Sequence, residues 1–204
     1  MSSETSKPSR GRPKTLKKED VLNIAMMSYW AKGPLRVSIN DICREAGVSK
    51  PGLYREFGGI DGLMKESLIF YENVVLRKLR EILSAEEDFS TTLSALVQAV
   101  TTPYENFPLG CLYVKFKQTY PWVGEETQAQ IRQTRDNSVA VYEDWIQQAQ
   151  DQGIVSKERS AKFLAMYVDA QVGLAQSLIA QGMKPVEVRE ILDTALSREK
   201  GAFF

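Results

Sequence analysis

Apolar residues recur three or four positions apart along most of the chain, a spacing typical of amphipathic helices. No segment alternates apolar and polar residues for long enough to predict a strand. The spacing therefore predicts an all-α fold with about nine helices. The expected elements are a helix over 19–31, two short helices within 38–57, and further helices over 60–82, 90–101, 109–119, 125–152, from a Ser156 cap to before Gly182, and over 185–197.

The segment 38–57 has the pattern of two short helices joined by a tight turn. Ser38 is a good N-cap, and Asp41 suits the first turn that follows it. Gly47 permits a left-handed turn, after which Ser49 caps the second helix. Apolar residues four positions apart pin the two helices together, namely Ile42, Ala46, Leu53 and Phe57.

The second short helix leaves polar side chains on the side opposite its apolar pair. Lys50, Tyr54 and Arg55 face outward, and Gly52 permits close approach to another surface. Such a face suits the major groove of DNA. We predict DNA contacts from both short helices and their caps: Ser38, Asn40, Ser49, Lys50, Pro51, Gly52, Tyr54 and Arg55. Within this set, we expect Ser49 and Tyr54 to contact phosphate rather than bases.

This segment resembles the DNA-binding part of the tetracycline-repressor (TetR/AcrR) family of bacterial transcription regulators. The matching residues are Ile42, Ala46, Gly47, Val48, Ser49, Leu53, Tyr54 and Phe57, with Ile24, Ala25 and Gly33 upstream and Leu63 downstream. The resemblance covers roughly residues 17–68. It implies a helical C-terminal domain that binds a small effector and dimerises, in a bacterial, cytoplasmic, nucleoid-associated protein.

The chain departs from the family pattern at Gly59 and Ile60, where a Ser-Lys or Asn-Lys pair is common. That lysine often touches a phosphate, and Ile60 cannot do so. Backbone N–H groups at the start of the next helix can still bind phosphate, so we expect a weakened contact. Glu56 stands where the family often has His, and is either a solvated residue or an acceptor for a cytosine amino group.

Charge is distributed unevenly, although the net charge is zero. Residues 1–65 hold 12 Lys and Arg against 7 Asp and Glu, whereas residues 66–204 hold 14 against 19. A basic end on an acidic body is typical of a DNA-binding protein. The run Arg10-Gly11-Arg12-Pro13-Lys14 also resembles an AT-hook core, so we predict that Arg10, Arg12 and Lys14 follow an A/T-rich minor groove. A basic tail that only aids solubility is the alternative.

Composition argues against catalysis and against a bound metal. The chain has no His, which removes the commonest general base and metal ligand, and no Gly-rich phosphate loop or Cys/His cluster. We expect no enzyme activity, no cofactor and no metal. Two cysteines, Cys43 and Cys111, favour a reducing cytoplasm. We find no secretory signal, and no apolar run approaches the ~18 residues that a membrane span needs.

The chain after residue 65 holds 15 of the 19 aromatic residues. Several gather around a loop at 102–110 and the helix after it, where a ligand pocket is one interpretation and core packing the other. The candidate pocket residues are Tyr104, Phe107, Tyr113, Phe116, Tyr120 and Trp145. Cys111, at the start of that helix, is either a redox sensor or a buried apolar thiol.

The helix expected to end before Gly182 is apolar on more than one side, and its centre over 170–179 carries no charge. Such a helix must bury two sides. One side can face its own domain and the other a twofold partner, although a core helix of a monomer is the alternative. The candidate interface residues are Ala170, Gly173, Leu174, Leu178, Ile191 and Ala195.

We predict three parts: a basic arm over 1–18, a helix-turn-helix domain over 19–65, and an effector-binding and dimerisation domain over 66–204. The expected function is a homodimeric regulator, most simply a repressor, that binds a palindromic double-stranded operator and leaves it when a small molecule binds. One alternative is an all-helical carrier or enzyme without a DNA role. The other is an architectural A/T minor-groove binder that acts through the arm.

Overall fold

The computed structural model describes residues 17–85 and 87–196, and every regular element in those ranges is helical. The α-helices are α1 (Lys18–Lys32), α2 (Ile39–Ala46), α3 (Lys50–Phe57), α4 (Ile60–Tyr71), α5 (Arg77–Leu83), α6 (Phe89–Thr101), α7 (Leu112–Gln118), α8 (Glu125–Asp151), α9 (Ala161–Ala180) and α10 (Pro185–Leu196). Two 3₁₀ turns, η1 (Pro34–Arg36) and η3 (Tyr120–Trp122), link them, and a π-helical turn, η2 (Glu72–Leu76), joins α4 to α5. The predicted all-α fold is confirmed, with nine helices in the described part if α4, η2 and α5 count as one.

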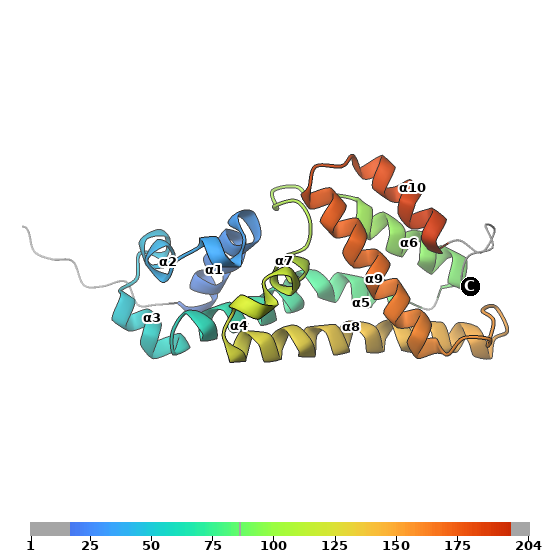
Figure 1. Ribbon diagram of the computed structural model, residues 1–204, viewed down its shortest axis with the longest axis horizontal. Helices are drawn as coiled ribbons and strands as arrows, with labels where there is room; N and C mark the ends of the chain where they lie inside the picture. The colour runs from blue at the N-terminus through green and yellow to red at the C-terminus, as the bar shows by residue number, and fades with distance from the viewer. Residues whose placement is uncertain (1–16, 86, 197–204) are drawn as a thin grey trace, which may run out of the picture.

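The molecule is elongated, with α1, α2 and α3 at one end and α6, α9 and α10 towards the other (Figure 1). The long helix α8 packs on α4 near its start and on α9 further along, so it connects the two ends. Helix α7 lies between them and contacts α1, α4, α8 and α9. Because α4 also packs on both α1 and α3, the two ends are joined chiefly through α4, α7 and α8.

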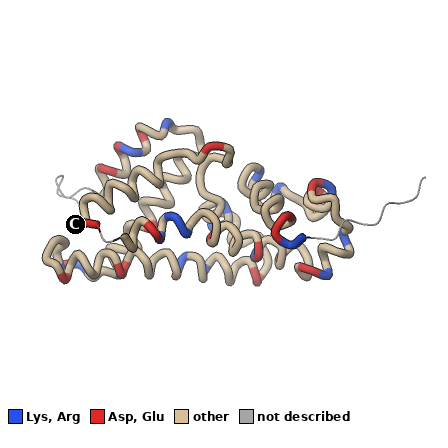
Figure 2. Tube along the Cα trace, turned by 180° about the vertical axis from the view of Figure 1, so that it is seen from behind, with Lys and Arg blue, Asp and Glu red and all other residues tan. Residues whose placement is uncertain are grey.

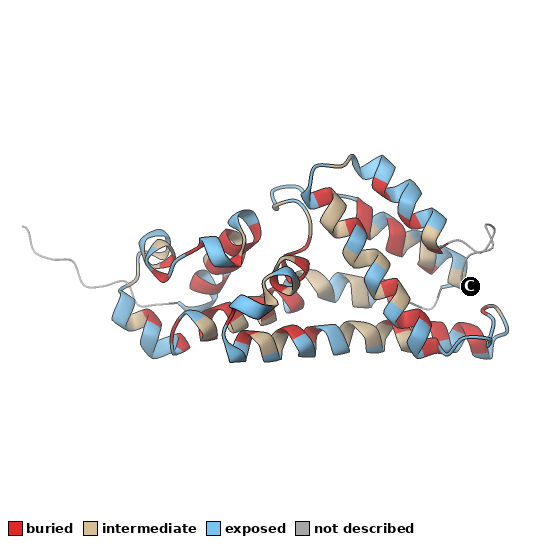
Figure 3. Ribbon diagram, in the orientation of Figure 1, coloured by how far each residue is buried: buried red, intermediate tan, exposed pale blue. Residues whose placement is uncertain are grey.

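Two groups of buried side chains hold these elements together, and each alternates with exposed positions along the helices (Figure 3). The first joins α1, α2, α3 and α4 to α7 and reaches Ile131 of α8. The second is built by α6, the later part of α8, α9 and α10. The predicted boundary after residue 65 therefore falls within the first core, since Leu68, Leu112 and Phe116 share that core with Leu53.

The expected long helix from Ile60 contains an interruption that its periodicity did not predict. At η2 the backbone takes a π-helical turn, which inserts one extra residue and shifts the helix face. Glu72 lies in this turn and is buried, with its carboxylate accepting from Arg80 at 3.0 Å, Asn137 at 3.0 Å and Thr134 at 3.1 Å. These contacts satisfy the buried charge and fasten the turn to α8.

Two predicted helix starts were wrong. Ser156 does not cap α9: Ser160 does, with its hydroxyl accepting from the N–H of Phe163 at 3.2 Å. The carbonyl of Ser156 instead accepts from Gln150 at 2.8 Å, which keeps the preceding residues in a loop. Helix α7 begins at Leu112 rather than 109, because Gly110 has a φ of 79° that no helix accommodates.

Candidate functional site

The two short helices form a compact helix-turn-helix with the expected caps. The hydroxyl of Ser38 accepts from the N–H of Asp41 at 3.2 Å, and the carboxylate of Asp41 accepts from the N–H of Ser38 at 3.1 Å. Hydrogen bonds from Ser38, followed by that from Arg44, lower the pKa of Asp41 to about 2. Gly47 takes the left-handed conformation with a φ of 67°, and the Ser49 hydroxyl accepts from the N–H of Gly52 at 3.2 Å. Local capping therefore fixes the angle between α2 and α3.

Helix α3 separates an apolar face from a polar one. Leu53 and Phe57 are buried in the first core. The predicted DNA-contacting residues of this helix and of the caps are exposed or, for Gly52, half-buried: Ser38, Asn40, Ser49, Lys50, Pro51, Tyr54 and Arg55. Lys50 Nζ lies 5.9 Å from the centre of the Tyr54 ring, so the two side chains share one patch. The predicted residues Arg10, Arg12 and Lys14 lie outside the described residues.

The start of α4 lies beside this face. Gly59 precedes α4 with a φ of 144° and supplies no side-chain cap, so backbone N–H groups of the first turn have no side-chain acceptor. Such a helix start favours anions. Ile60 is partly exposed there, as expected from the departure in sequence.

Charge on the described part of this end is only mildly positive. Residues 17–65 hold eight Lys and Arg against six Asp and Glu, so most of the basic excess of residues 1–65 belongs to the first 16 residues. Figure 2 shows the two signs mixed along the helix-turn-helix. The basic pattern seen in the sequence is therefore carried mainly by the arm.

Gly62 sets the distance between α3 and α4, a role that the sequence pattern did not reveal. A Cβ at this position would lie 1.9 Å from the carbonyl oxygen of Phe57. Only Gly allows α4 to cross the end of α3 at this separation. The orientation of the recognition helix thus depends on a missing side chain in the neighbouring helix.

Asp61 links the helix-turn-helix end to the body. Its carboxylate accepts from the N–H of Glu126 at 3.0 Å and of Thr127 at 3.1 Å, which are the first-turn donors of α8. Gly124, which precedes α8, has no capping side chain, and a Cβ there would lie 2.2 Å from the Asp61 carboxyl. Asp61 therefore caps a helix that begins more than 60 residues later.

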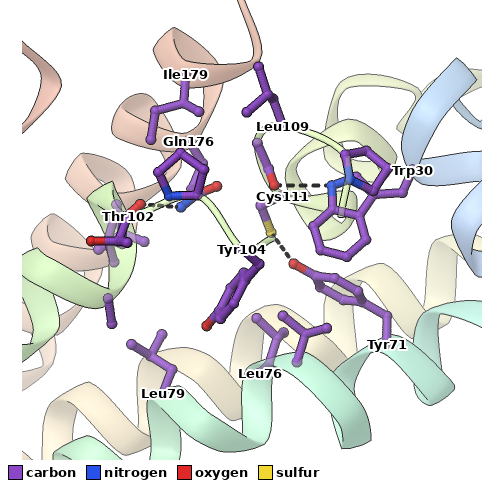
Figure 4. A pocket seen from close by; sticks show the side chains of 17 residues that line it. Trp30, Tyr71, Leu76, Leu79, Thr102, Tyr104, Leu109, Cys111, Gln176 and Ile179 are labelled. Atoms are coloured by element: carbon purple, nitrogen blue, oxygen red, sulfur yellow. Dashed lines mark hydrogen bonds between the residues drawn. The ribbon is translucent and has the colours of Figure 1, made fainter. Parts of the chain in front are cut away.

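A cavity of about 80 Å³ lies between the two ends of the molecule (Figure 4). Its walls come from α1, α4, η2, α5, α6, the loop 102–111 and α9. Trp30 and Tyr71 lie on one side, with Gln176 and Thr102 opposite and Tyr104 descending from the loop between them (Figure 4). None of the described side chains that line this cavity is charged. It is therefore suited to a small and mainly apolar ligand.

Only part of the predicted aromatic set lies at this cavity. Tyr104 lines it, and Tyr104 and Phe107 line a second hollow beside it. Four of the predicted pocket residues line neither hollow: Tyr113, Phe116, Tyr120 and Trp145. Phe116 and Tyr113 are core residues on α7, Tyr120 contacts Arg132, and Trp145 stacks on Phe89 at 4.5 Å in the second core. Aromatic clustering in the sequence therefore mixed core and pocket residues.

Trp30 places the end of α1 in the cavity wall. Its indole N–H donates to the carbonyl of Gly110 at 3.0 Å, and its own carbonyl accepts from Lys115. Its ring packs edge-on against Tyr71 with 5.0 Å between centres. A helix of the helix-turn-helix domain is thus bonded directly to the loop that closes the cavity.

Cys111 lies deep in the same wall and is not an accessible thiol. Its Sγ accepts from the hydroxyl of Tyr71 at 3.1 Å, and burial raises the pKa of the thiol above its usual value. Burial and this hydrogen bond also raise the pKa of Tyr71. A neutral thiol that is enclosed in this way favours the structural interpretation of Cys111 over the sensor.

The predicted interface residues lie on α9 and α10, two helices that pack on each other and expose several apolar side chains. Leu174 is 47% exposed and Ile191 is 40% exposed, while Leu178 and Ala195 are half-buried. Ala170 is exposed and Gly173 half-buried, and further exposed apolar residues on the same helices are Phe163, Met166 and Val186. Helix α9 is also long and apolar enough, by length and composition, to cross a membrane, although it contains Lys162 and Asp169 and packs on α6, α8 and α10.

Gly173 lies close to a cation, because a Cβ at this position would be 3.9 Å from Lys117 Nζ. Lys117 pairs with Asp169 at 3.3 Å. A Glu at position 173 would therefore have a possible partner, and Leu174 is the better site at which to test the surface.

A capped helix-turn-helix with an exposed polar face, carried on a helical body, is the geometry of a helix-turn-helix DNA-binding domain. Residues 21–67 match the family model described as bacterial regulatory proteins, tetR family. The match covers the helix-turn-helix end, so this end of the chain is similar to the DNA-binding domain of that family of regulators. It is 27% identical over 116 residues to the HTH-type transcriptional repressor ComR of Escherichia coli (strain K12), and the match spans about half of each protein, 55%.

Solved structures share the fold over most of the chain. The TetR-family regulator CifR, as a cysteine double mutant in a structure with 26-base-pair operator DNA, has a TM-score of 0.77 at 19% identity, with 89% of this chain and 96% of that chain covered. A regulator from Saccharomonospora viridis in complex with choline has a TM-score of 0.71 at 18% identity, with 88% and 94% covered. At these identities the likeness concerns the fold.

Proposed function

We propose that this protein is a homodimeric repressor that binds a palindromic operator and is released when a small molecule enters the cavity. The observation that carries the proposal is Trp30, because this residue belongs to the DNA-binding end and also lines the cavity. The repressor sign is supported by the E. coli relative. The division into an arm over 1–18, a DNA-binding domain over 19–65 and a regulatory domain over 66–204 is part of the same proposal.

The DNA-binding part of the proposal rests on α3 and the start of α4. Lys50, Tyr54 and Arg55 are exposed on α3, and the uncapped first turn of α4 lies next to them. In a twofold dimer, two such helices about one DNA turn apart would enter successive major grooves and bind two half-sites. The CifR complex with operator DNA shows that this fold is compatible with such binding in another protein.

The proposal of a dimer rests on the exposed apolar side chains of α9 and α10. A soluble protein rarely leaves several large apolar side chains exposed side by side unless another surface covers them. A second copy with the same surface, related by a twofold axis, covers all of them at once. Phe163, Met166 and Leu174 on α9 and Ile191 on α10 are the central residues of the proposed interface.

The proposal of release by a ligand rests on two connections between the cavity and the DNA-binding end. The first is the Trp30 hydrogen bond to Gly110 in the closing loop, and the second is the cap that Asp61 supplies to α8. A ligand shifts the protein from the DNA-binding state only if it binds another state more tightly. A ligand that separates the loop 102–111 from Trp30 would free α1 to change its angle. The S. viridis complex with choline shows a small ligand bound by a protein of this fold.

The test is selection of genomic fragments by the purified full-length protein, followed by titration of the selected duplex at several salt concentrations. We expect a palindromic site and an affinity that falls ~10³- to 10⁵-fold between 50 and 200 mM salt, as for a protein that neutralises ~6 to 10 phosphates. The same titration after deletion of residues 1–14 tests the predicted arm contacts of Arg10, Arg12 and Lys14. Absence of any sequence preference would contradict the proposal.

A further inference from the structure

The cavity beside Trp30 adjoins the second hollow, which Phe107 also lines. This second hollow of about 100 Å³ is lined by Val74, Val75, Lys78, Tyr104 and Phe107. The two hollows share Val75 and Tyr104, so these two side chains form the partition between them. Each hollow alone is smaller than a 150 Å³ cavity that holds benzene, whereas the two joined exceed it.

The two side chains of the partition differ in how firmly the structure holds them. Tyr104 is 39% exposed and Phe107 37%, and both belong to the loop 102–111, where Asn106 holds a left-handed φ of 64°. Val75, in contrast, is fixed in the π-helical turn η2. Rotation of Tyr104 toward solvent would therefore remove one of the two side chains that separate the inner and outer hollows.

Lys78 is the one charged residue among the described side chains that line the two hollows. Its neighbours Arg77 and Arg80 are paired with Glu81 and Glu72, but the described residues offer Lys78 no ion pair. Its ammonium group lies over the Tyr104 ring, 5.4 Å from the centre. Within the described part of the chain, Lys78 is thus a cation without an ion-pair partner at a space whose other lining residues are uncharged.

This arrangement selects among ligand charges. The aromatic residues Trp30, Tyr71, Tyr104 and Phe107 could attract a cation through their ring faces. However, none of the described carboxylates lines either hollow, and Lys78 already occupies the face of Tyr104. A cationic ligand would therefore meet an uncompensated like charge. An anion placed at Lys78 gains a charge-assisted hydrogen bond instead.

We propose that the joined space binds a small organic acid, a single-ring carboxylate with its ring in the inner hollow and its carboxylate on Lys78. The inner walls are apolar, and Gln176 already donates to the carbonyl of Val100 at 2.6 Å, which leaves its side-chain oxygen free to accept from a ring substituent. Such a ligand moves Tyr104 and occupies the space beside Trp30. The inference rests on the proposed effector function only for its consequence, not for the binding itself.

The test uses three probes with the same ring and different charge: benzoate, benzyl alcohol and benzyltrimethylammonium. Binding is measured by calorimetry on the full-length protein without DNA. We expect benzoate to bind at least about tenfold more tightly than benzyl alcohol, as for one charge-assisted contact, and the cation to bind most weakly. Equal binding of benzoate and benzyl alcohol, tighter binding of the cation, or no binding of benzoate at millimolar concentration would overturn the proposal.

Variants locate the charge. Lys78→Gln should weaken benzoate binding about tenfold and leave benzyl alcohol binding unchanged, while Lys78→Arg should retain benzoate. Arg77→Gln is the matched control, because it removes the same charge one residue away and outside both hollows. A loss of benzoate binding as large in Arg77→Gln as in Lys78→Gln would show that the effect is general electrostatics, and would overturn the site.

Operator binding is measured separately, so that the two proposals can fail independently. If benzoate binds through Lys78 but does not release the operator, the acid site stands and the effector role fails. If the protein binds no operator at all, the DNA-binding proposal fails and the calorimetric result is unaffected.

Discussion

The helix-turn-helix and the cavity differ in how far apart in sequence their parts lie. The residues that shape the first, Ser38 to Phe57, are contiguous, and each cap closes over three residues. The cavity brings together Trp30, Tyr71, Tyr104 and Gln176, which come from four separate segments. The first site can thus keep its shape through local contacts, whereas the second exists only when the whole domain is folded.

This difference has a consequence for regulation. A site held by local caps is rigid and changes position as a unit, because breaking a cap costs ~1 kcal/mol and there are several. A site assembled from distant segments can have more than one arrangement that differs little in free energy. We therefore expect ligands to act on the cavity and to move the helix-turn-helix without altering its internal structure.

The largest expected effect comes from a substitution in the proposed dimer interface, outside both regions. Leu174→Glu places a charge in the proposed interface, where an unpaired buried charge costs several kcal/mol, so we expect a monomer with greatly weakened operator binding. The helix-turn-helix itself should remain folded by circular dichroism. Gln148→Glu, which adds the same charge at an exposed position of α8, is the control. Sedimentation showing a dimer for the Leu174 variant would exclude this side of α9.

Gly62→Ala tests whether the recognition helix is positioned from outside itself. A Cβ 1.9 Å from the Phe57 carbonyl must push α3 and α4 apart, and we expect a loss of about 3 kcal/mol in the free energy of unfolding together with weaker operator binding. The same exchange at Gly173, where Lys117 Nζ at 3.9 Å is the nearest atom, should cost nothing. Urea denaturation compares the two. An unchanged midpoint for Gly62→Ala would mean that the helices do not pack this closely.

Substitutions on α3 test which of its exposed residues contact DNA. Arg55→Ala should weaken specific binding by ~1–3 kcal/mol if this residue contacts a base edge, while Lys50→Ala should weaken specific and nonspecific binding about equally if it contacts phosphate. Glu56→Ala removes an exposed acidic side chain of the same helix and is the control, which should not weaken binding if Glu56 is solvated. Fluorescence anisotropy with operator and scrambled duplexes measures both effects. Negligible effects of Arg55→Ala and Lys50→Ala would show that another face meets DNA.

The smallest expected effects come from removing two helix caps, of which only one joins the helix-turn-helix end to the body. Asp61→Ala removes the cap that α4 supplies to α8, and Asp88→Ala removes the local cap of α6, whose carboxylate accepts from the N–H of Thr91 at 3.0 Å. Each should cost ~1 kcal/mol of stability. Only Asp61→Ala should also change the ligand concentration that releases the operator. Equal release curves for the two variants would remove Asp61 from the proposed route.

The sequence by itself determined the class of fold and the local geometry of the helix-turn-helix. Caps, the Gly47 turn and the apolar pairs of α2 and α3 involve residues three or four positions apart, so their pattern is visible in the order of residues. The same reasoning placed the exposed face of α3 and the apolar character of α9. It misplaced the start of α9, because two serines near the helix start are equally good caps and only the position of Gln150 decides between them.

Only the tertiary structure decided the cavity and the connections to it. Trp30, Gly62, Lys78 and Asp61 owe their roles to neighbours that lie on other helices or across a turn. Aromatic density could not separate Tyr104, which lines the cavity, from Trp145, which stacks in the second core. The physical reason is that burial of a ring releases the same water whether its neighbour is a side chain or a ligand, and only the packing of distant segments leaves the space for one.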